Sequence, residues 1–238
     1  VHQELGSKSP NLILPDADID DAVTRGVRSC FSNSGQSCNA PTRMLVLADH
    51  LALAEQAARR EAERTVVGDP RSQETGIGPV VSRTQFDRIQ HFIRLGIEEG
   101  ATLVAGGPGR PDGLGDGFYV RPTVFSNVTP GMTIATEEIF GPVLSIMTYR
   151  TEDEAVALAN DSVYGLAAYV QSKDLERARR IAARLRVGNV HINYPAWNPA
   201  APFGGYKRSG NGREYAEFGL VEYLETKGTT GYTEGGAR

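Results

Sequence analysis

The stretch from Val143 to Asn193 decides the fold: VLSIMTY-RT-EDEAVALAN-DSVY-GLAAYV-QSKD-LERARRIAARL-RVG-NVHIN. Short runs rich in Val, Ile, Ala and Tyr alternate with longer runs in which Ala, Leu, Glu and Arg recur at helical spacing. Strands that are joined through helices pair in parallel, so this alternation predicts a parallel α/β sheet. The predicted strands are Val143–Tyr149, Gly165–Val170 and Asn189–Asn193, and the predicted helices are Glu152–Asn160 and Leu175–Leu185.

The same alternation extends towards the N-terminus. An acidic segment, Asp16–Asp18, suits a helix start, and apolar residues follow it at helical spacing up to Cys30 and Phe31. The glycine-rich segment 106–117 lacks the G-x-G-x-x-G order of a phosphate loop, so a surface loop is predicted there. Further predicted elements are a strand at Thr42–Leu47, helices at Leu51–Arg64 and Thr84–Glu99, a strand at Thr102–Val104 and an extended segment at Phe118–Phe125, broken by Pro122.

Composition narrows the class of protein. The 238 residues carry a net charge of −4 and are 40% hydrophobic, which is ordinary for a globular protein and gives no basic stripe for a nucleic acid. The longest apolar runs, such as Val143–Met147, are too short to span a bilayer. Two cysteines and four scattered histidines predict neither a disulfide framework nor a metal site, and favour a reducing, cytoplasmic setting. Because the sequence opens on Val1 in the middle of a pattern, we expect it to belong to a longer chain.

Cys38 is the first candidate for chemistry. It lies in NSGQSCNAPTR (33–43), between a predicted helix and a predicted strand, where Pro41 stops any helix. A tight connection can present a thiol to a ligand, and backbone N–H groups in the turn can favour the thiolate. The alternative is a small buried hydrophobic residue, the usual environment of a free cysteine. Cys30 lies on the apolar stripe of the preceding helix, where that alternative is favoured.

Glu4 is the second candidate. It stands beside a Leu-Gly turn in QELGSKSP (3–10). A partly desolvated carboxyl has a raised pKa and can act as a general base. On local sequence alone, however, a solvated surface glutamate is favoured.

Four segments, read in order, resemble one family. ELGSKSP (4–10), GQSC (35–38), EEIFGPV (137–143) and PFGGYKRSGNGRE (202–214) are similar to successive signatures of the aldehyde dehydrogenase superfamily, with compatible spacing. The likeness extends from Glu4 to about Lys227. It implies the family's parallel-sheet catalytic domain over residues 1–222, without the N-terminal cofactor-binding region. It also implies a C-terminal segment, 223–238, whose strand at about Tyr223–Tyr232 adds to a neighbouring subunit.

The resemblance also assigns roles to residues. It implies that Cys38 is the catalytic thiol, that Glu4 is the general base, and that Glu138 and Phe140 hold the ribose and flank the ring of the nicotinamide. The alternative for Glu137 and Glu138 is an ordinary acidic pair at the surface. The implied cofactor is NAD or NADP, the substrate is a small aldehyde, and the assembly is a homodimer or homotetramer. Three aromatic residues either line the substrate funnel or belong to the core: Tyr194, Trp197 and Phe203.

One residue departs from the family pattern. Ser7 stands where the family usually has a second glycine after Glu-Leu-Gly. If that position needs a positive φ or a close backbone approach, a serine is strained there. The departure bears on the loop that aims Glu4.

Three rival functions use parts of the same pattern. A thiol hydrolase would use Cys38 without redox chemistry, but such enzymes normally pair cysteine with histidine, and EEIFGPV would then have no role. A non-catalytic assembly module would not need Cys38, Glu4 and Glu138 together. A CoA-acylating relative would need no base for water, so Glu4 favours hydrolysis.

Overall fold

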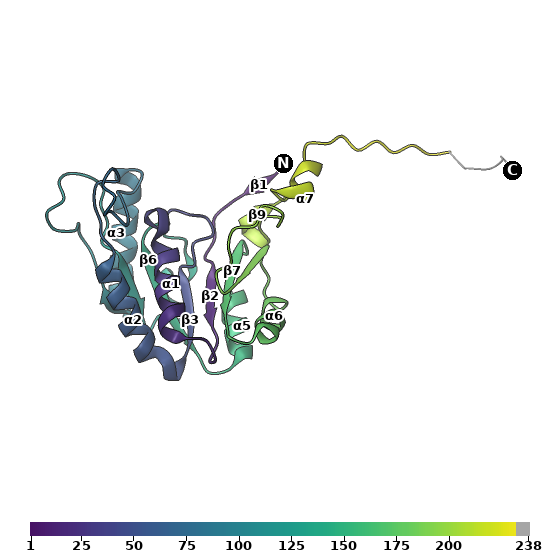
Figure 1. Cartoon of the computed structure of the whole chain (residues 1–238). Helices are drawn as coiled ribbons and strands as arrows, with labels where there is room; N and C mark the ends of the chain where they lie inside the picture. The colour runs from purple at the N-terminus through teal and green to yellow at the C-terminus, as the bar shows by residue number, and fades with distance from the viewer. Residues whose placement is uncertain (232–238) are drawn as a thin grey trace.

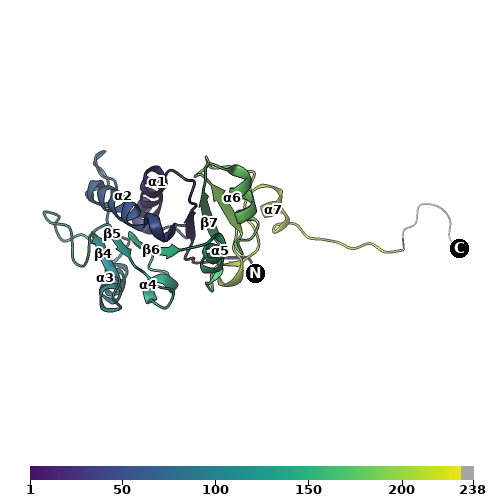
Figure 2. The same cartoon turned by 90° about the horizontal axis from the view of Figure 1, so that it is seen from below.

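The computed structural model describes residues 1–231. Its main sheet has seven strands in the order β4-β5-β6-β3-β2-β7-β8 (Figures 1 and 2). All neighbours pair in parallel except the edge strand β4, which is antiparallel to β5, so the prediction of a parallel sheet is correct for six of the seven strands. The strands are β2 (Pro10–Ile13), β3 (Arg43–Leu47), β4 (Thr102–Ala105), β5 (Thr123–Ser126), β6 (Val143–Tyr149), β7 (Ala167–Gln171) and β8 (Asn189–Ile192).

Helices cover both faces of this sheet. The longer helices are α1 (Ile19–Phe31), α2 (Leu51–Arg64), α3 (Arg83–Glu98), α5 (Glu152–Asn160) and α6 (Leu175–Ala182), and the shorter ones are α4 (Thr133–Thr136) and α7 (Ala216–Val221). Helices α1 and α2 pack together on one face, and α3, α4, α5 and α6 share the hydrophobic core on the other (Figure 2). The side chains of each strand divide between the two faces, as a strand buried on both sides requires: on β3, Met44 and Val46 face α1 and α2, and Leu45 faces the other layer.

Side-chain caps explain where several helices begin. The Asp18 carboxylate accepts from the backbone N–H of Asp21 at the start of α1, and the Ser82, Thr151 and Asp174 side chains do the same for α3, α5 and α6. Each such cap stabilises a helix by about 1 kcal/mol. The predicted boundaries of α2, β6 and α5 are confirmed.

Other boundaries differ for tertiary reasons. The strand predicted from Gly165 begins at Ala167, because the backbone of Gly165 is held by Ser209, Gly188 and Tyr206. The helix predicted to reach Leu185 ends at Ala182 and continues as turns. The sequence interpretation did not include a two-stranded ribbon formed by β1 (Gln3–Glu4) and β9 (Gly210–Asn211). It also missed β2, which lies inside the sheet between β3 and β7.

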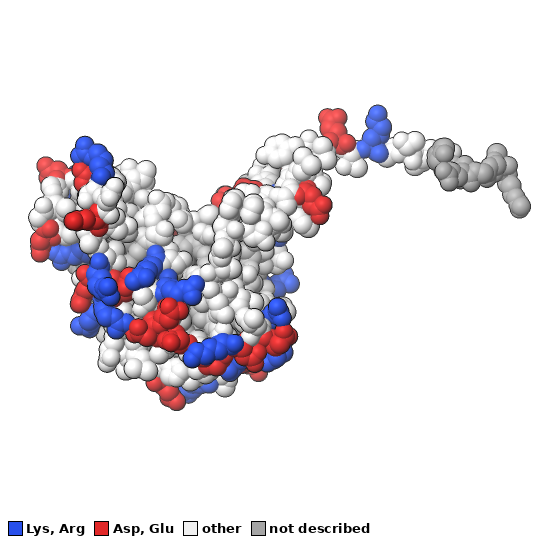
Figure 3. All heavy atoms as spheres, viewed as in Figure 1, with Lys and Arg blue, Asp and Glu red and all other residues white. Residues whose placement is uncertain are grey.

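The C-terminal segment leaves the body of the molecule after α7 (Figure 1). The strand predicted at Tyr223–Tyr232 is not formed within residues 223–231, and Tyr232 lies outside the described residues. Pairing with a neighbouring subunit therefore stays a prediction. Among residues 1–231 no helix is long and apolar enough to cross a membrane. Figure 3 shows Lys, Arg, Asp and Glu intermixed over the lower part of one face, and fewer charged atoms around the hollow at its upper edge.

Candidate active site

The candidate residues gather at the amino ends of three parallel strands. Glu4 precedes β2, Cys38 precedes β3, and Glu138 with Phe140 precedes β6. Because β6, β3 and β2 are neighbours and run in parallel, their amino ends meet at one edge of the sheet. Open α/β sheets commonly bind ligands at the opposite, carboxyl edge. The tertiary arrangement thus brings together residues that are more than 130 positions apart in the sequence.

Cys38 lies on a tight turn, as predicted. Between α1 and β3 the chain forms a short 3-10 turn, η1 (Ser32–Gly35), in which Asn33 and Ser34 adopt positive φ angles of 52° and 57°. The Ser34 hydroxyl donates to the Gly78 carbonyl at 2.9 Å, and the Gln36 side-chain carbonyl accepts from the Val81 N–H at 3.0 Å. These bonds hold the entry to the Cys38 turn against the loop before α3.

The loop that carries Cys38 touches the loop that carries Phe140 through two glycines. Gly35 has a φ of +70°, and a Cβ built there would lie 2.2 Å from the carbonyl carbon and oxygen of Gly141. No side chain fits into that backbone contact. The GQSC and EEIFGPV segments therefore form one packed unit.

The two thiols have different surroundings. Cys30 is fully buried on α1 with its Sγ 3.8 Å from the Val143 carbonyl oxygen, and burial raises the pKa of its thiol to about 12. Cys38 is only partly buried. Partial burial, and then the neighbouring Glu4 carboxylate, raise the pKa of the Cys38 thiol to about 12 as well.

In this chain by itself the surroundings of Cys38 thus favour the thiol over the thiolate, and its role as the nucleophile stays a prediction. Hydrogen bonds from the backbone N–H groups of Asn39 and Cys38 do lower the pKa of the Cys38 thiol, as the turn predicted. Burial and the negative charge of Glu4 outweigh them. The thiol needs a base, or a change in its surroundings, before it can attack.

Glu4 is held beside Cys38 by the last of the four segments. Strand β1 pairs with β9, and Glu4 stands opposite Gly210. The Ser209 hydroxyl donates to the Gly6 carbonyl at 2.8 Å, and the Leu5 N–H donates to the Ser209 carbonyl at 3.1 Å. The Glu4 Oε1 atom is buried with no hydrogen-bond partner among residues 1–231, so Glu4 is not the fully solvated surface residue that the local sequence favoured.

Ser7 is not strained. Its φ is not positive, and its side chain is buried with the hydroxyl 2.9 Å from the hydroxyl of Ser9. The position at which a side chain would displace a neighbour is the preceding one, because a Cβ on Gly6 would lie 2.2 Å from Glu138 Oε2. The concern about Ser7 is thus corrected, since the close approach occurs at Gly6.

Glu138 and Phe140 lie on a loop clamped by α3. The Gln85 side-chain amide donates to the carbonyls of Ile139 and Phe140, each at 2.9 Å, and Arg88 donates to the Glu138 carbonyl at 2.7 Å. Phe140 adopts a φ of 59°. Glu137 is exposed, whereas Glu138 is partly buried and accepts the Ser7 N–H on Oε1 at 2.7 Å. Burial raises the pKa of Glu138, while the Ser7 N–H and the charge of Lys8 act in the opposite direction.

The free hydrogen-bond acceptor of this loop fits a ribose. A carboxylate can accept two hydrogen bonds from vicinal hydroxyls, and Glu138 Oε2 makes no protein hydrogen bond among the described residues. Because Gly6 has no side chain, Oε2 can occupy the space beside it. Nothing in this loop distinguishes NAD from NADP.

The sequence interpretation did not predict that two basic residues, Lys8 and Arg43, are buried. The Lys8 side chain is 1% exposed and its Nζ has no hydrogen-bond partner in residues 1–231; burial and the charge of Arg43 lower the pKa of Lys8 to about 7. The Arg43 guanidinium donates to the carbonyls of Lys8, Leu158 and Ala159 at 2.9–3.0 Å, and so joins β3 and the segment before β2 to the end of α5. Nothing in the local sequence marks a lysine or arginine as buried, because hydrophobic periodicity assigns charged residues to the surface.

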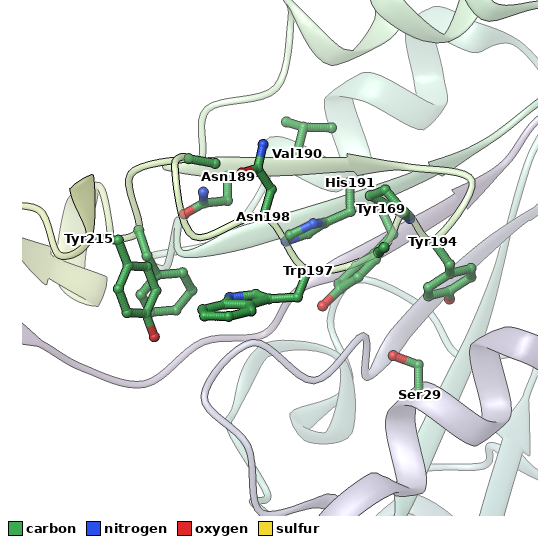
Figure 4. Close-up of a pocket in the computed structure, with 13 residues that line it drawn as sticks. Ser29, Tyr169, Asn189, Val190, His191, Tyr194, Trp197, Asn198 and Tyr215 are labelled. Atoms are coloured by element: carbon green, nitrogen blue, oxygen red, sulfur yellow. The ribbon is translucent and has the colours of Figure 1, made fainter. Parts of the chain in front are cut away.

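The three aromatic residues share the wall of one cavity of about 520 Å³ (Figure 4). Trp197 is 74% exposed, which excludes it from the core, and Tyr194 and Phe203 lie on either side of it in sequence and along the same cavity. The lining also includes residues that sequence reasoning missed: Ser29, Tyr169, Asn189, Val190, His191, Asn198 and Tyr215. Among residues 1–231 no cluster of three or more His, Cys, Asp or Glu side chains could hold a metal ion.

Comparison with known proteins identifies the same family as the sequence resemblance. The model of the "Aldehyde dehydrogenase family" matches residues 1–229. The 3-succinoylsemialdehyde-pyridine dehydrogenase of a Pseudomonas species is 54% identical over 232 residues, which are 98% of this chain and 49% of that protein. A putative aldehyde dehydrogenase of Staphylococcus saprophyticus is 47% identical with the same coverage. The chain thus spans about half the length of the curated relatives it matches.

Solved structures agree in fold. A mutant of aldehyde dehydrogenase C from Pseudomonas syringae, in complex with NAD⁺ and octanal, superposes with a TM-score of 0.98 at 58% identity, covering all of this chain and 49% of that one. An aldehyde dehydrogenase of Mycobacterium tuberculosis complexed with NAD⁺ superposes with a TM-score of 0.92 at 44% identity, covering 97% of this chain and 48% of that one.

Proposed function

Because the chain belongs to the aldehyde dehydrogenase family and has its fold, we propose that it is the catalytic half of an enzyme that oxidises an aldehyde to a carboxylic acid with NAD or NADP. The observation that carries the proposal is the convergence of Cys38, Glu4 and Glu138 at one edge of the sheet. A protein of the relatives' length that carries this chain as its second half is called the full-length enzyme below.

The reaction begins at Cys38. Its thiol loses a proton, and Sγ bonds to the aldehyde carbon to form a thiohemiacetal. The oxygen that was the carbonyl becomes an anion, and we assign its stabilisation to the backbone N–H at Cys38. A second donor is assigned to the other half of the full-length enzyme.

Glu138 and Phe140 form the cofactor side of the site. The Glu138 carboxylate holds the ribose hydroxyls, and Phe140 flanks the ring. Bound NAD(P)⁺ supplies the hydride acceptor. Loss of hydride from the tetrahedral carbon leaves a thioester on Cys38.

Glu4 completes the cycle. Its carboxylate, partly withdrawn from solvent and beside Cys38, takes a proton from water as the water oxygen attacks the thioester carbon. The carbon–sulfur bond breaks, the acid is released and the thiol is restored. A hydrolytic role agrees with the position of Glu4 next to the thiol.

The aromatic cavity supports a substrate class: its lining does not include Cys38, but one lining residue, Tyr169, is hydrogen-bonded to the Cys38 turn. The cavity's lining is dominated by aromatic and other apolar groups, and its volume of about 520 Å³ suits a medium-chain or aromatic aldehyde. The related P. syringae structure contains octanal. We therefore propose octanal as the first substrate to test.

The test is an assay of the full-length enzyme with octanal, in which NADH or NADPH formation is followed by absorbance. Stoichiometric formation of octanoic acid and reduced cofactor is expected, and Cys38→Ala should abolish it while Cys30→Ala should not. Release of acid from an ester without any aldehyde oxidation would replace this proposal with a thiol hydrolase. Formation of an acyl-CoA in preference to the acid would indicate the CoA-acylating alternative.

A further inference from the structure

We propose that Tyr169 is a positioning residue for Cys38: its hydroxyl tethers the turn that presents the thiol and links that turn to the wall of the aromatic cavity. The inference rests on the proposed role of Cys38 as nucleophile. The Tyr169 hydroxyl donates to the Asn39 backbone carbonyl at 3.0 Å, one residue beyond the nucleophile. No part of the four recognisable segments contains Tyr169.

The turn itself has few restraints. The Ala40 N–H donates to the Ser37 carbonyl at 3.1 Å, which places Cys38 and Asn39 at the two central positions of a β-turn. Within the described part of the chain, the bond from Tyr169 is the only hydrogen bond to the backbone of Ser37–Ala40 from a side chain outside the turn. It therefore restrains the orientation of the second half of this turn.

The donor is on a rigid support. Tyr169 is 7% exposed and lies in β7, between β2 and β8, directly opposite Asn11 and His191 in the two pairings. Its ring stacks on His191 with 5.0 Å between centroids and 25° between planes, and lies 5.3 Å from the ring of Tyr194 (Figure 4). Cross-strand aromatic pairs of this kind restrict the ring, so the hydroxyl is fixed in direction.

The hydrogen bond from the Tyr169 hydroxyl does not depend on pH over the range of an assay. Burial raises the pKa of Tyr169, so its hydroxyl remains a proton donor throughout the pH range of an assay. The N–H groups of Asn39 and Cys38, which lower the pKa of the thiol, belong to the tethered turn. Partial burial of the sulfur, which raises that pKa, depends on the same orientation.

The tether also joins two parts of the site. The ring of Tyr169 lines the cavity together with Tyr194 and His191, while its hydroxyl holds the Cys38 turn. Loss of the hydroxyl should disturb the thiol without removing the aromatic wall.

The experiment compares two tyrosines that make the same kind of bond. Tyr149 is 1% exposed and its hydroxyl donates to the Ile13 carbonyl at 2.7 Å, on a different strand and away from Cys38. Tyr169→Phe and Tyr149→Phe each remove one buried hydroxyl from the 238-residue chain. The rate of Cys38 alkylation by iodoacetamide is measured from pH 7 to 11 by peptide mass mapping, with melting temperatures measured alongside.

For Tyr169→Phe we expect faster alkylation of Cys38 at pH 8, because greater solvent access lowers the pKa of the thiol. The rate should rise by about tenfold for each pKa unit of that decrease. Hydrogen exchange of the peptide that contains residues 36–42 should also accelerate. Tyr149→Phe should change neither quantity, although it also loses one hydrogen bond. Replacement of Tyr169 by 4-aminophenylalanine, which restores a donor at the same place, should return both quantities towards the wild-type values.

Unchanged alkylation in Tyr169→Phe, with or without faster exchange, would overturn the proposal, as would failure of 4-aminophenylalanine to restore a changed profile. If Tyr169→Phe does not fold, His191→Leu serves as the second variant, because it removes the stacked ring and retains the hydroxyl. It should shift the Cys38 profile in the same direction, and an unchanged profile there would also contradict the role of Tyr169. These readouts need neither cofactor nor aldehyde, so they can fail independently of the proposed function.

Discussion

The backbone N–H of Ser7 donates to Glu138 Oε1 at 2.7 Å, across 131 positions of sequence. This bond joins the loop that aims the proposed general base to the carboxylate proposed to hold the ribose. Beside it, Gly6 leaves the space that Glu138 Oε2 occupies. The geometry of the cofactor side therefore depends on the ELGSK segment as much as on EEIFGPV.

Substitution of Gly6 tests that dependence. Gly6→Ala would place a Cβ 2.2 Å from Glu138 Oε2, so the carboxylate must turn away. Hydrogen bonds to charged groups contribute about 1.5–3 kcal/mol, so NAD⁺ should bind the full-length enzyme roughly 10- to 100-fold more weakly by calorimetry. Ser7→Ala, which keeps the N–H to Glu138 and loses only the contact with Ser9, is the matched control and should bind normally. Equal affinity of the two variants for NAD⁺ would contradict the assignment of Glu138 to the cofactor site.

Access, not acidity, should distinguish the two cysteines. The pKa values of both thiols are raised to about 12, but Cys30 is fully buried and Cys38 is not. Limiting iodoacetamide should therefore label Cys38 first. Because the thiolate fraction below the pKa grows tenfold per pH unit, the labelling rate should rise steeply between pH 7 and 10. Peptide mapping is the measurement, and preferential labelling of Cys30 in the folded chain would contradict it.

Glu4→Gln should have two effects of opposite sign. In the chain by itself the negative carboxylate raises the pKa of Cys38, so its removal should lower that pKa and accelerate alkylation at pH 8. In the full-length enzyme the same variant should hydrolyse the thioester about 10²–10⁴-fold more slowly, because glutamine cannot accept the proton from water. Glutamine is nearly isosteric, so folding should be preserved.

Rapid-mixing kinetics separate the two steps in which Glu4 can act. A retained NADH burst, followed by a slow steady rate, agrees with the assignment to water. A lost burst with normal hydrolysis of a preformed acyl-enzyme would mean that Glu4 deprotonates the thiol instead. Glu137→Gln, on an exposed carboxylate, serves as the control.

Lys8 should make stability depend on pH. Its pKa is lowered from 10.5 to about 7 in the folded chain, so above pH 7 the unfolded chain binds more protons and stability rises with pH. The slope can reach about 1.4 kcal/mol per pH unit. Above pH 9 the raised pKa values of Cys30 and Cys38 act in reverse, because the folded chain then retains protons that the unfolded chain has lost.

Urea unfolding of the 238-residue chain measures this profile, which should have its maximum near pH 9. Lys8→Met should remove the rise between pH 7 and 9 and should stabilise the chain at pH 7, because it replaces a buried group that lacks a hydrogen-bond partner among residues 1–231. Lys173→Met, at an exposed lysine, should leave the profile unchanged. A flat wild-type profile would show that the Lys8 ammonium gains solvent or a partner.

The chain alone should not oxidise aldehydes. One oxyanion donor and most of the cofactor contacts are assigned to the other half of the full-length enzyme, and loss of one such donor alone costs roughly 10²–10³ in rate. Octanal with NAD⁺ should give no detectable NADH with the 238-residue chain under conditions in which the full-length enzyme turns over. Robust turnover by the chain would place a complete cofactor site within residues 1–238.

Much of the fold could be predicted from the sequence because the elements with strong local patterns are also the ones that tertiary contacts leave unchanged. The boundaries of α2, β6 and α5 follow from helical or strand periodicity and, for α5, also from the Thr151 cap. Short elements were not predicted, because they have no strong local pattern and depend on tertiary contacts. Strands β1 and β9 have two residues each and exist only because they pair with one another across the chain.

The sequence by itself determined the fold class, the family and the identity of Cys38, Glu4, Glu138 and Phe140 as candidates, because these depend on local periodicity and on ordered segments that can be recognised without coordinates. Only the tertiary structure decided that Gly6 rather than Ser7 is the sterically restricted position, that Lys8 and Arg43 are buried, and that Tyr169 contacts the Cys38 turn. Burial, desolvation and contact depend on distances between segments far apart in the chain. Local sequence contains no record of those distances, so the acidity of a thiol or the placement of a buried lysine appears only when the sheet is assembled.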